Sequence, residues 1–147
     1  MILKPVPIFP LEEDKDIKFL FDLLKERTDI QSVKHSTMPT YEKHKKFVKS
    51  RPFDKWYIIT VEFITNGKEK TEKSIGTIYL TEKNEIGVFL LAEYIDCGFG
   101  QMALSLLMQE NPRQFYLANI NPQNEKSIRF FSKNNFKPYQ VTYRSDG

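Results

Sequence analysis

The stretch that decides the fold of this chain is EIGVFLLAEYIDCGFGQMALSLLMQEN, residues 85 to 111. It opens with a β-rich apolar run, Ile86 to Leu91, and passes through a polar connection to two glycines, Gly98 and Gly100. A helical run, Gln101 to Met108, begins directly after the glycines. The pattern therefore predicts a strand, a glycine turn and a helix, in that order.

The glycine turn has a chemical use. A helix that begins on glycines presents unpaired backbone N–H groups and the positive end of its dipole, and together these bind an anion. Glycine also lets the backbone approach the anion, because it has no Cβ. The helical run is apolar nearly all round and stops before Asn111-Pro112, since a residue before proline avoids the α region. We therefore expect an anion-binding turn held between a strand and a buried helix.

Composition bounds the class of protein. The chain has 147 residues, so we expect one domain over 1–147 with a single core. Apolar and charged fractions of 40% and 28% are typical of globular proteins, and a net charge of +3 is too mild for a nucleic-acid binder. No apolar run approaches the ~20 residues of a membrane helix, and the proline-broken N-terminus has no signal-peptide pattern. We therefore expect a cytoplasmic protein that binds neither nucleic acid nor membrane.

Metal and disulfide chemistry is not expected. Cys97 is the only cysteine, which excludes an intrachain disulfide and a cysteine-based metal site. His35 and His44 are the only histidines, so no metal is predicted. Cys97 as a nucleophile would need a histidine partner placed by the fold, and it fits better as a small residue that fills the turn.

The residues before residue 50 predict one strand and two helices. Val6 to Phe9 fit an irregular edge strand, because prolines surround them. Asp14 to Arg27 fit a helix whose apolar residues recur at helical spacing. Thr40 is a suitable N-cap for a second helix, Tyr41 to Ser50.

Two further strands precede the stretch quoted above. Trp56 to Ile64 alternate between two faces, as a strand does. Asn66-Gly67 is a turn signal, and the polar tract Lys68 to Lys73 lengthens the connection to the next strand, Ser74 to Leu80. With the strand that begins at Ile86, these strands should form an antiparallel meander.

The residues after the central helix predict a strand, a helix and a strand. A strand-helix-strand crossover would place Phe115 to Ile120 parallel to the strand that begins at Ile86. Glu125 to Asn134 fit a helix, and Asn135 stands where a helix ends in a left-handed residue. Phe136 to Tyr143 fit a final strand. The inward residues of the last helix are expected to be Ile128 and Phe131.

The order of these elements resembles the GNAT superfamily of acyl-CoA-dependent N-acetyltransferases. The phosphate loop of that family has Arg or Gln, two residues, Gly, one residue, then Gly or Ala. Gly98 and Gly100 match this pattern, whereas Ile95 stands where the Arg or Gln belongs. The resemblance implies an α/β (α+β) fold with a mixed, mostly antiparallel sheet, a splayed parallel strand pair and helices on both faces.

A second motif of the family begins at Asn124. The family has Asn followed by a helix that ends in Gly-Phe, and this chain has NEKSIRFFSKNNF, with Asn135-Phe136 in place of Gly-Phe. The two motifs carry the resemblance from Glu85 to Phe136. In the order of its elements, the resemblance covers about the whole chain.

The resemblance implies acetyl-CoA as the cofactor, in a cleft where the strands Ile86 to Leu91 and Phe115 to Ile120 splay apart. The pantetheine amides would pair with the open edge of the first strand, as an added strand does. The pyrophosphate would bind N–H groups from Gly98 to Met102, and a backbone N–H near Leu91 would stabilise the oxyanion when an amine attacks the thioester. The cofactor-binding residues implied are Phe89, Leu90, Leu91, Cys97, Gly98, Phe99, Gly100, Gln101, Met102, Asn124, Ser127 and Phe131.

Glu85 is the catalytic residue that the resemblance implies. In histone-type members a glutamate at the corresponding strand start is the general base and takes the amine proton through water. The alternative is a solvated acid at a strand end. Phe131, seven residues after Asn124, occupies the place where many members have a tyrosine that protonates the leaving thiolate. Phenylalanine cannot donate a proton, so either another group serves or none is needed.

Tyr41 and His44 share one face of the second predicted helix. A histidine followed three residues later by an aromatic residue resembles members that act on nucleotide-linked amino sugars, so these residues would line the acceptor pocket. The alternative is a partly buried histidine between helices.

The function implied is a transferase that moves an acetyl group from acetyl-CoA to the primary amine of a small molecule. A nucleotide-linked amino sugar is the favoured acceptor, and a monomer or homodimer is expected. One alternative is a protein N-terminal acetyltransferase of the ribosomal-protein type. Another is a catalytically silent acyl-CoA-binding domain, which the departures at Ile95 and Phe131 keep open.

Overall fold

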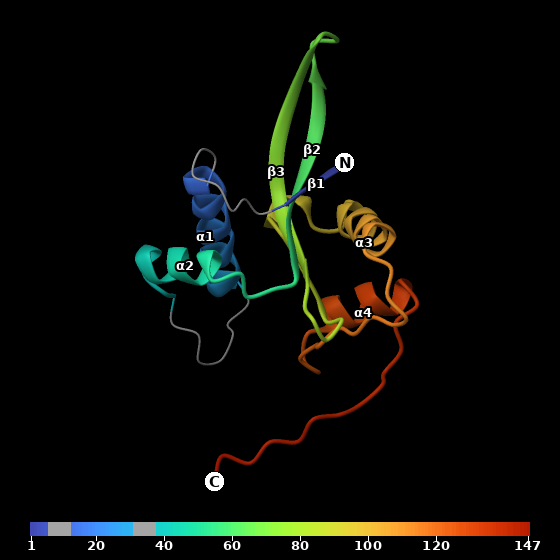
Figure 1. Cartoon of the computed structure of the whole chain (residues 1–147). Helices are drawn as coiled ribbons and strands as arrows, with labels where there is room; N and C mark the ends of the chain where they lie inside the picture. The colour runs from blue at the N-terminus through green and yellow to red at the C-terminus, as the bar shows by residue number, and fades with distance from the viewer. Residues whose placement is uncertain (6–12, 31–37) are drawn as a thin grey trace.

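The computed structural model in Figure 1 describes residues 1–5, 13–30 and 38–147. A four-stranded sheet of order β1-β2-β3-β4 lies between α1 and α2 on one side and α3 and α4 on the other. None of the helices in these ranges is long and apolar enough to cross a membrane. The elements are β1 (Ile2–Pro5), α1 (Glu13–Ile30), α2 (Tyr41–Lys49), β2 (Lys55–Thr65), β3 (Glu69–Leu80), β4 (Ile86–Leu90), η1 (Ala92–Tyr94), α3 (Phe99–Glu110) and α4 (Glu125–Lys133).

The sheet is antiparallel throughout, which confirms the predicted meander of β2, β3 and β4. β1 pairs with the outer edge of β2, through Ile2 opposite Thr60 and Pro5 opposite Tyr57. The edge strand predicted at Val6 to Phe9 lies outside the described residues. The parts of the fold class that hold are therefore the mostly antiparallel sheet and the helices on both faces.

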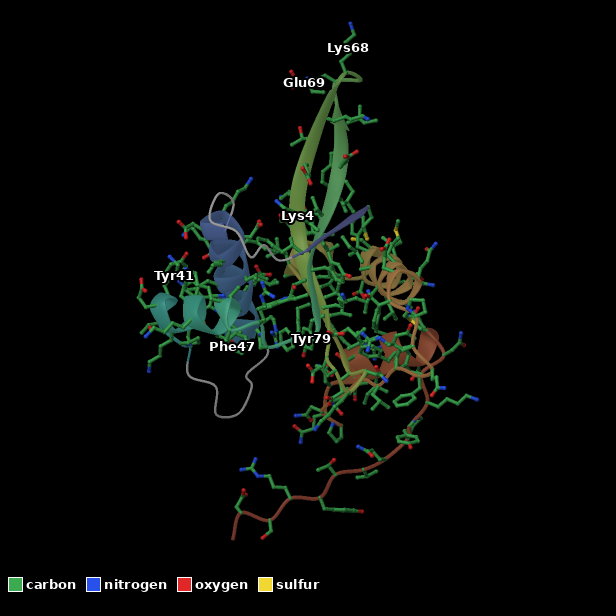
Figure 2. The ribbon with its side chains drawn as sticks, viewed as in Figure 1. Lys4, Tyr41, Phe47, Lys68, Glu69 and Tyr79 are labelled. Carbon is green, nitrogen blue, oxygen red and sulfur yellow. The ribbon has the colours of Figure 1, made fainter. Side chains whose placement is uncertain are left out.

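The β2–β3 hairpin is longer than predicted. Asn66 and Gly67 both adopt positive φ, 52° and 73°, as a tight hairpin turn requires. Strand pairing then resumes at Thr65 opposite Glu69. The prediction of a polar connection over Lys68 to Lys73 was wrong from Glu69 onward, because backbone pairing next to a tight turn does not need apolar side chains. Lys68 and Glu69 mark the far end of the hairpin (Figure 2).

The core has two parts, one on each face of the sheet. Ile59 packs with the buried residues of α3, such as Leu104 and Leu107. Its neighbour Ile58 points to the opposite face and packs with Ile17 of α1, since successive strand residues alternate between faces. Both isoleucines are fully buried. Burial contributes roughly 1.5–3 kcal/mol for each such side chain, so β2 ties the two helical layers together.

The predicted parallel strand Phe115 to Ile120 is reduced to a single bridge. Leu117 forms a parallel bridge with Glu85, through Ile86 N–H to Leu117 O at 2.8 Å and Leu117 N–H to Asn84 O at 2.8 Å. Tyr116 is held by its side chain instead, because its hydroxyl donates to Asn111 O at 2.7 Å. A ladder needs a continuous run of paired residues, and here the pairing ends after one.

The predicted final strand, Phe136 to Tyr143, is absent from the described sheet. After Phe136, the chain runs away from the body of the molecule (Figure 1). Tyr139, Val141 and Tyr143 are 81%, 76% and 93% exposed. Their alternation fits a strand, but strand propensity acts through a paired and half-buried neighbour, and the segment around Leu117 offers none.

The end of α4 partly follows the prediction. Asn135 has φ 69°, which confirms the left-handed residue after the helix. Phe131 is buried, with 7% of its surface exposed, whereas Ile128 is 39% exposed, so the prediction that both face inward was wrong for Ile128. Phe130 takes the inward position instead and packs against the core on the α3 side.

Candidate functional site

The two glycines of the turn are needed for different reasons. Gly98 has φ 84° and precedes α3 as its N-cap, and a Cβ there would meet nothing within 4 Å. It is needed for its backbone conformation. Gly100 lies inside the helix, where a Cβ would stand 3.0 Å from Cε1 of Phe130 and 3.6 Å from Cδ1 of Leu90. A side chain there would crowd the Phe130 ring, so Gly100 lets the start of α3 pack closely against α4 and β4.

The start of α3 presents backbone donors. Met102 N–H donates to Gly98 O at 3.2 Å and closes the first turn. The N–H groups before it, from Phe99 to Gln101, have no acceptor within the helix. Gly98 has no side chain that could cap them. The turn therefore has the donors and the open approach that the sequence predicted for an anion.

The outer edge of β4 lies beside this turn. Ile86 N–H points outward to Leu117 O, whereas Leu91 N–H points inward to Ile75 O at 2.8 Å. Because orientation alternates along a strand, the backbone groups of Val88 and Leu90 point outward too. β4 is the last strand of the described sheet, and beyond the Leu117 bridge no described strand pairs with this edge. An extended ligand can therefore add to it as a strand does.

The backbone N–H groups near Leu91 are mostly engaged. Leu91 N–H is used in the sheet, and Ala92 N–H donates to Glu26 Oε1 at 2.5 Å. Leu90 N–H, which faces the outer edge, is the donor near Leu91 that remains for an oxyanion.

The other residues implied for the cofactor lie in different environments. Asn124 caps α4, and its Oδ1 accepts from Ser127 N–H at 3.1 Å. Phe131 is buried among Phe130 and Phe136, each with a ring centroid 5.0 Å away. The remaining side chains implied around the turn are exposed at Cys97, Gln101 and Met102 and half-buried at Phe99. Their roles toward a cofactor stay predictions.

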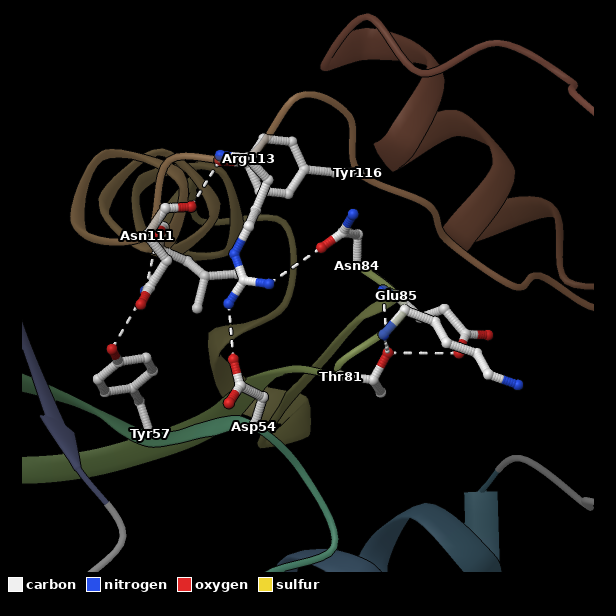
Figure 3. Close-up of polar contacts among 10 residues, drawn as sticks. Asp54, Tyr57, Thr81, Asn84, Glu85, Asn111, Arg113 and Tyr116 are labelled. Atoms are coloured by element: carbon white, nitrogen blue, oxygen red, sulfur yellow. Dashed lines mark hydrogen bonds and ion pairs between the residues drawn. The ribbon is translucent and has the colours of Figure 1, made fainter.

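Glu85 is fixed at the start of β4 by two side chains. Its Oε1 accepts from Thr81 Oγ1 at 3.3 Å, and its Oε2 accepts from Nδ2 of Asn119. Thr81 Oγ1 in turn accepts from Glu85 N–H at 3.1 Å (Figure 3). Glu85 lies on the wall of an open pocket of about 550 Å³. The pocket is lined by Arg51, Pro52, Phe53, Asp54, Thr81, Glu82, Lys83 and Glu85.

Arg113 braces this end of β4, and the sequence analysis missed it. Its guanidinium donates to Asn84 Oδ1 at 3.1 Å and pairs with Asp54 Oδ2 at 2.6 Å (Figure 3). Asn84 immediately precedes Glu85, so the brace holds the strand start that carries the carboxylate. Arg113 and Asp54 are 59 residues apart, and no local pattern signals a pair at that separation.

A row of aromatic rings lies on the α1 face of β3 and β4. Phe53 stacks on Tyr79 with ring centroids 3.8 Å apart, and Tyr79 lies 6.2 Å from Phe89. Burial raises the pKa of Tyr79; the nearby Arg27 opposes this and Glu85 adds to it. Tyr79, Arg27 and Glu85 therefore belong to one electrostatic neighbourhood, although Arg27 and Tyr79 were not among the predicted site residues.

Tyr41 and His44 lie between α1 and α2. The Phe21 ring centroid is 5.4 Å from that of Tyr41 and 5.5 Å from that of His44. His44 is 5% exposed, and burial lowers its pKa, against the effect of the Ile17 backbone. This position agrees with the interpretation of a buried histidine, while the acceptor role of both residues stays a prediction.

We find no candidate metal site among the described residues. They contain no group of three or more histidine, cysteine, aspartate or glutamate side chains that could hold an ion.

No protein-family model and no curated protein matches the chain. Solved structures with the same fold do match. An acetyltransferase from Thermus thermophilus is 16% identical, with a TM-score of 0.63 over 92% of this chain and 86% of that chain. A transcriptional regulator from Bacillus halodurans is 14% identical, with a TM-score of 0.62 over 99% of each chain.

An aminoglycoside acetyltransferase from an uncultured soil metagenomic sample, solved with trehalose, is 12% identical. Its TM-score is 0.58 over 91% of each chain. Identities this low carry the fold and not the substrate. The chain therefore has the fold of these acetyltransferases.

Proposed function

We propose that this chain is an acetyl-CoA-dependent N-acetyltransferase that acts on the primary amine of a small molecule. The observation that carries the proposal is the position of the glycine turn at the end of a strand with an open edge. Donors for a pyrophosphate and donors for an extended amide chain thus come from one continuous stretch, Val88 to Gln101.

The residues at this edge fit coenzyme A. The N–H groups from Phe99 to Gln101 suit its pyrophosphate, and the outward groups of Val88 and Leu90 suit its pantetheine amides. When bound, acetyl-CoA supplies an acetyl group activated as a thioester. Leu90 N–H would donate to a carbonyl oxygen at this edge and favour negative charge on it.

Glu85 would act as the general base. An amine reaches the site protonated at neutral pH and must lose a proton before it can attack. The carboxylate is held by Thr81 and Asn119 and opens on the pocket, so we propose that it takes this proton through ordered water. The pocket carries both signs of charge, with Arg51 and Lys83 beside Asp54 and Glu82, which suits a polar acceptor.

Two observations favour other functions. Phe131 provides no proton for a leaving thiolate, and one match of the same fold is a transcriptional regulator. Both support a catalytically silent acyl-CoA-binding domain. Among acceptors, a nucleotide-linked amino sugar is our first choice and a protein α-amine is the second.

Two measurements on the purified chain separate these functions. Calorimetry with coenzyme A tests the cofactor site, and release of free thiol from acetyl-CoA with a panel of amines tests turnover. We expect saturable binding and amine-dependent thiol release. Binding without turnover of any amine would indicate the silent domain, and absence of binding would overturn the cofactor site itself.

A further inference from the structure

Arg27, in the last turn of α1, lies against the aromatic row. Its guanidinium Cζ lies 3.3 Å above the ring centroid of Phe89 in β4. A guanidinium this close to a ring is held by attraction to its π face, and the stacked geometry leaves its edge donors for another partner. The charge therefore lies against the strand that we assign to the cofactor.

Arg27 has no anionic partner among the side chains that the structure describes. The ion pairs among them do not include it, and its Nε is buried without a hydrogen-bond acceptor. The adjacent Glu26 is used by Ala92 N–H. Arg27 is half-buried, and taking a cation without a partner partly out of water is costly, so burial lowers the pKa of Arg27. An anionic group on a ligand would offset this desolvation cost by pairing with the guanidinium.

The position of Arg27 assigns this anion to the acceptor. The side chains of Val88 and Leu90 pack on the α3 side, so the ring of Phe89 between them points to the α1 face. Arg27 therefore lies over the α1 face, whereas the backbone groups that suit pantetheine point out from the edge of the strand. The phosphates of coenzyme A are assigned to the start of α3, on the other face. Tyr79 interacts electrostatically with both Arg27 and Glu85, so the guanidinium and the base lie near the same ring.

We propose that Arg27 binds a carboxylate or a phosphate carried by the acceptor amine, an inference that rests on the proposed N-acetyltransferase function. A guanidinium pairs with either group through two parallel N–H donors. The acceptor class is then a small amine that bears an anion. A nucleotide-linked amino sugar fulfils this condition through its diphosphate. A polycationic acceptor is disfavoured, because its charge would repel that of Arg27.

The test compares matched amines on the protein saturated with coenzyme A. β-Alanine and β-alaninamide differ in the carboxylate, and phosphoethanolamine and ethanolamine differ in the phosphate, so the two pairs separate the two anion chemistries. We expect the anionic member of at least one pair to bind ~10–100-fold more tightly by calorimetry, as a charge-assisted hydrogen-bonded pair predicts. Arg27→Gln should abolish that preference, and Arg27→Lys should keep part of it.

A matched control removes a charge elsewhere on the same helix. Lys25 is exposed, so Lys25→Gln should leave the preference unchanged. Circular dichroism establishes whether each variant is folded. If Arg27→Gln does not fold, Arg27→Lys takes its place, and it should show a reduced preference for the anionic amine. Equal binding of both members of both pairs by the wild type would overturn the proposal. So would a weaker affinity of Arg27→Gln for coenzyme A, because Arg27 would then bind the cofactor. Thiol release is read separately, and its absence bears on the proposed function alone.

Discussion

The two faces of β4 differ in how far apart in the sequence their site residues lie. On the α3 face, the glycine turn and the strand edge come from one stretch of sequence, so local backbone geometry places the donors. On the α1 face, Arg27, Phe53, Tyr79 and Glu85 come from four separate segments. A long-range ion pair, Arg113 to Asp54, braces this face near the base. The α3 face is thus specified locally, whereas the α1 face exists only in the complete fold.

This difference predicts that substitutions on the two faces of β4 have different effects. A change at the turn should weaken cofactor binding and leave the acceptor side intact, because the donors are backbone groups of a single helix end. A change on the α1 face should alter chemistry or acceptor choice with cofactor affinity unchanged. Substitutions on each face test this difference when the affinity for coenzyme A and the kinetics with the acceptor are both measured.

The largest effect is expected at Glu85. Glu85→Gln keeps the size of the side chain but removes the carboxylate that accepts the proton, and its amide has one acceptor oxygen for Thr81 or Asn119 in place of two. We expect kcat to fall by about 10²–10⁴ near neutral pH, with unchanged affinity for coenzyme A. The loss should shrink at high pH, where the free amine is already populated.

Steady-state kinetics from pH 6 to 9 measures this effect. Glu82→Gln is the matched control, since Glu82 is exposed and lines the same pocket. Wild-type kcat in Glu85→Gln across this range would show that the base is elsewhere or that the enzyme selects the neutral amine.

The next effect is expected at the turn. Gly100→Asp places bulk and a negative charge at the start of α3, where a Cβ already meets the Phe130 ring at 3.0 Å. Affinity for coenzyme A should fall more than tenfold, or ~1.4 kcal/mol, by calorimetry. Ser105→Asp adds the same charge at an exposed position of α3 and should bind normally. Unchanged binding in a folded Gly100→Asp protein would refute the assignment of the pyrophosphate.

The sequence predicted the α3 face well because its signals are local. The apolar run of β4, the glycines at 98 and 100 and the stop before Pro112 each act within a few residues. The same is true of Thr40, which caps α2 as predicted by accepting from Lys43 N–H at 3.3 Å. Long-range contacts leave no such pattern. The brace by Arg113 and the place of Arg27 over Phe89 depend on segments that meet only after folding.

The strand predictions that were wrong have the same cause. Phe136 to Tyr143 alternates like a strand, and Phe115 to Ile120 follows a helix as a crossover strand would. Each needs a paired neighbour, and the only pairing that the described residues provide there is the bridge at Leu117. Alternation reports that a strand is possible, whereas pairing decides whether it forms.

A smaller effect is expected at His44, where the interpretations of a buried histidine and of an acceptor residue compete. Its pKa is lowered by burial below the ordinary value of 6.5, so the unfolded chain binds the proton more readily than the folded one. The stability that the neutral ring contributes is therefore present above pH 6.5 and lost as the pH falls below it. Thermal unfolding of the wild type should show this loss, and His44→Gln should show less of it.

Kinetics separates the two interpretations of His44. His44→Ala should lower the free energy of unfolding by about 1–3 kcal/mol, because the ring packs against Phe21. The acceptor KM should stay near the wild-type value. A raised acceptor KM in a variant of normal stability would instead place His44 in the acceptor pocket.

The smallest effect is expected at the C-terminus. Deletion of residues 138–147 removes side chains that are exposed, Tyr139, Val141 and Tyr143 among them, so the free energy of unfolding should change by less than about 0.5 kcal/mol. Phe136→Ala is the contrasting variant. The Phe136 ring lies 5.0 Å from that of Phe131, so removal of this ring should cost about 1–3 kcal/mol in urea unfolding. A deletion that destabilised the protein by more than Phe136→Ala would mean that the alternating segment pairs with a strand in solution. Size-exclusion chromatography of the deleted and complete chains would then show whether that strand belongs to a second copy.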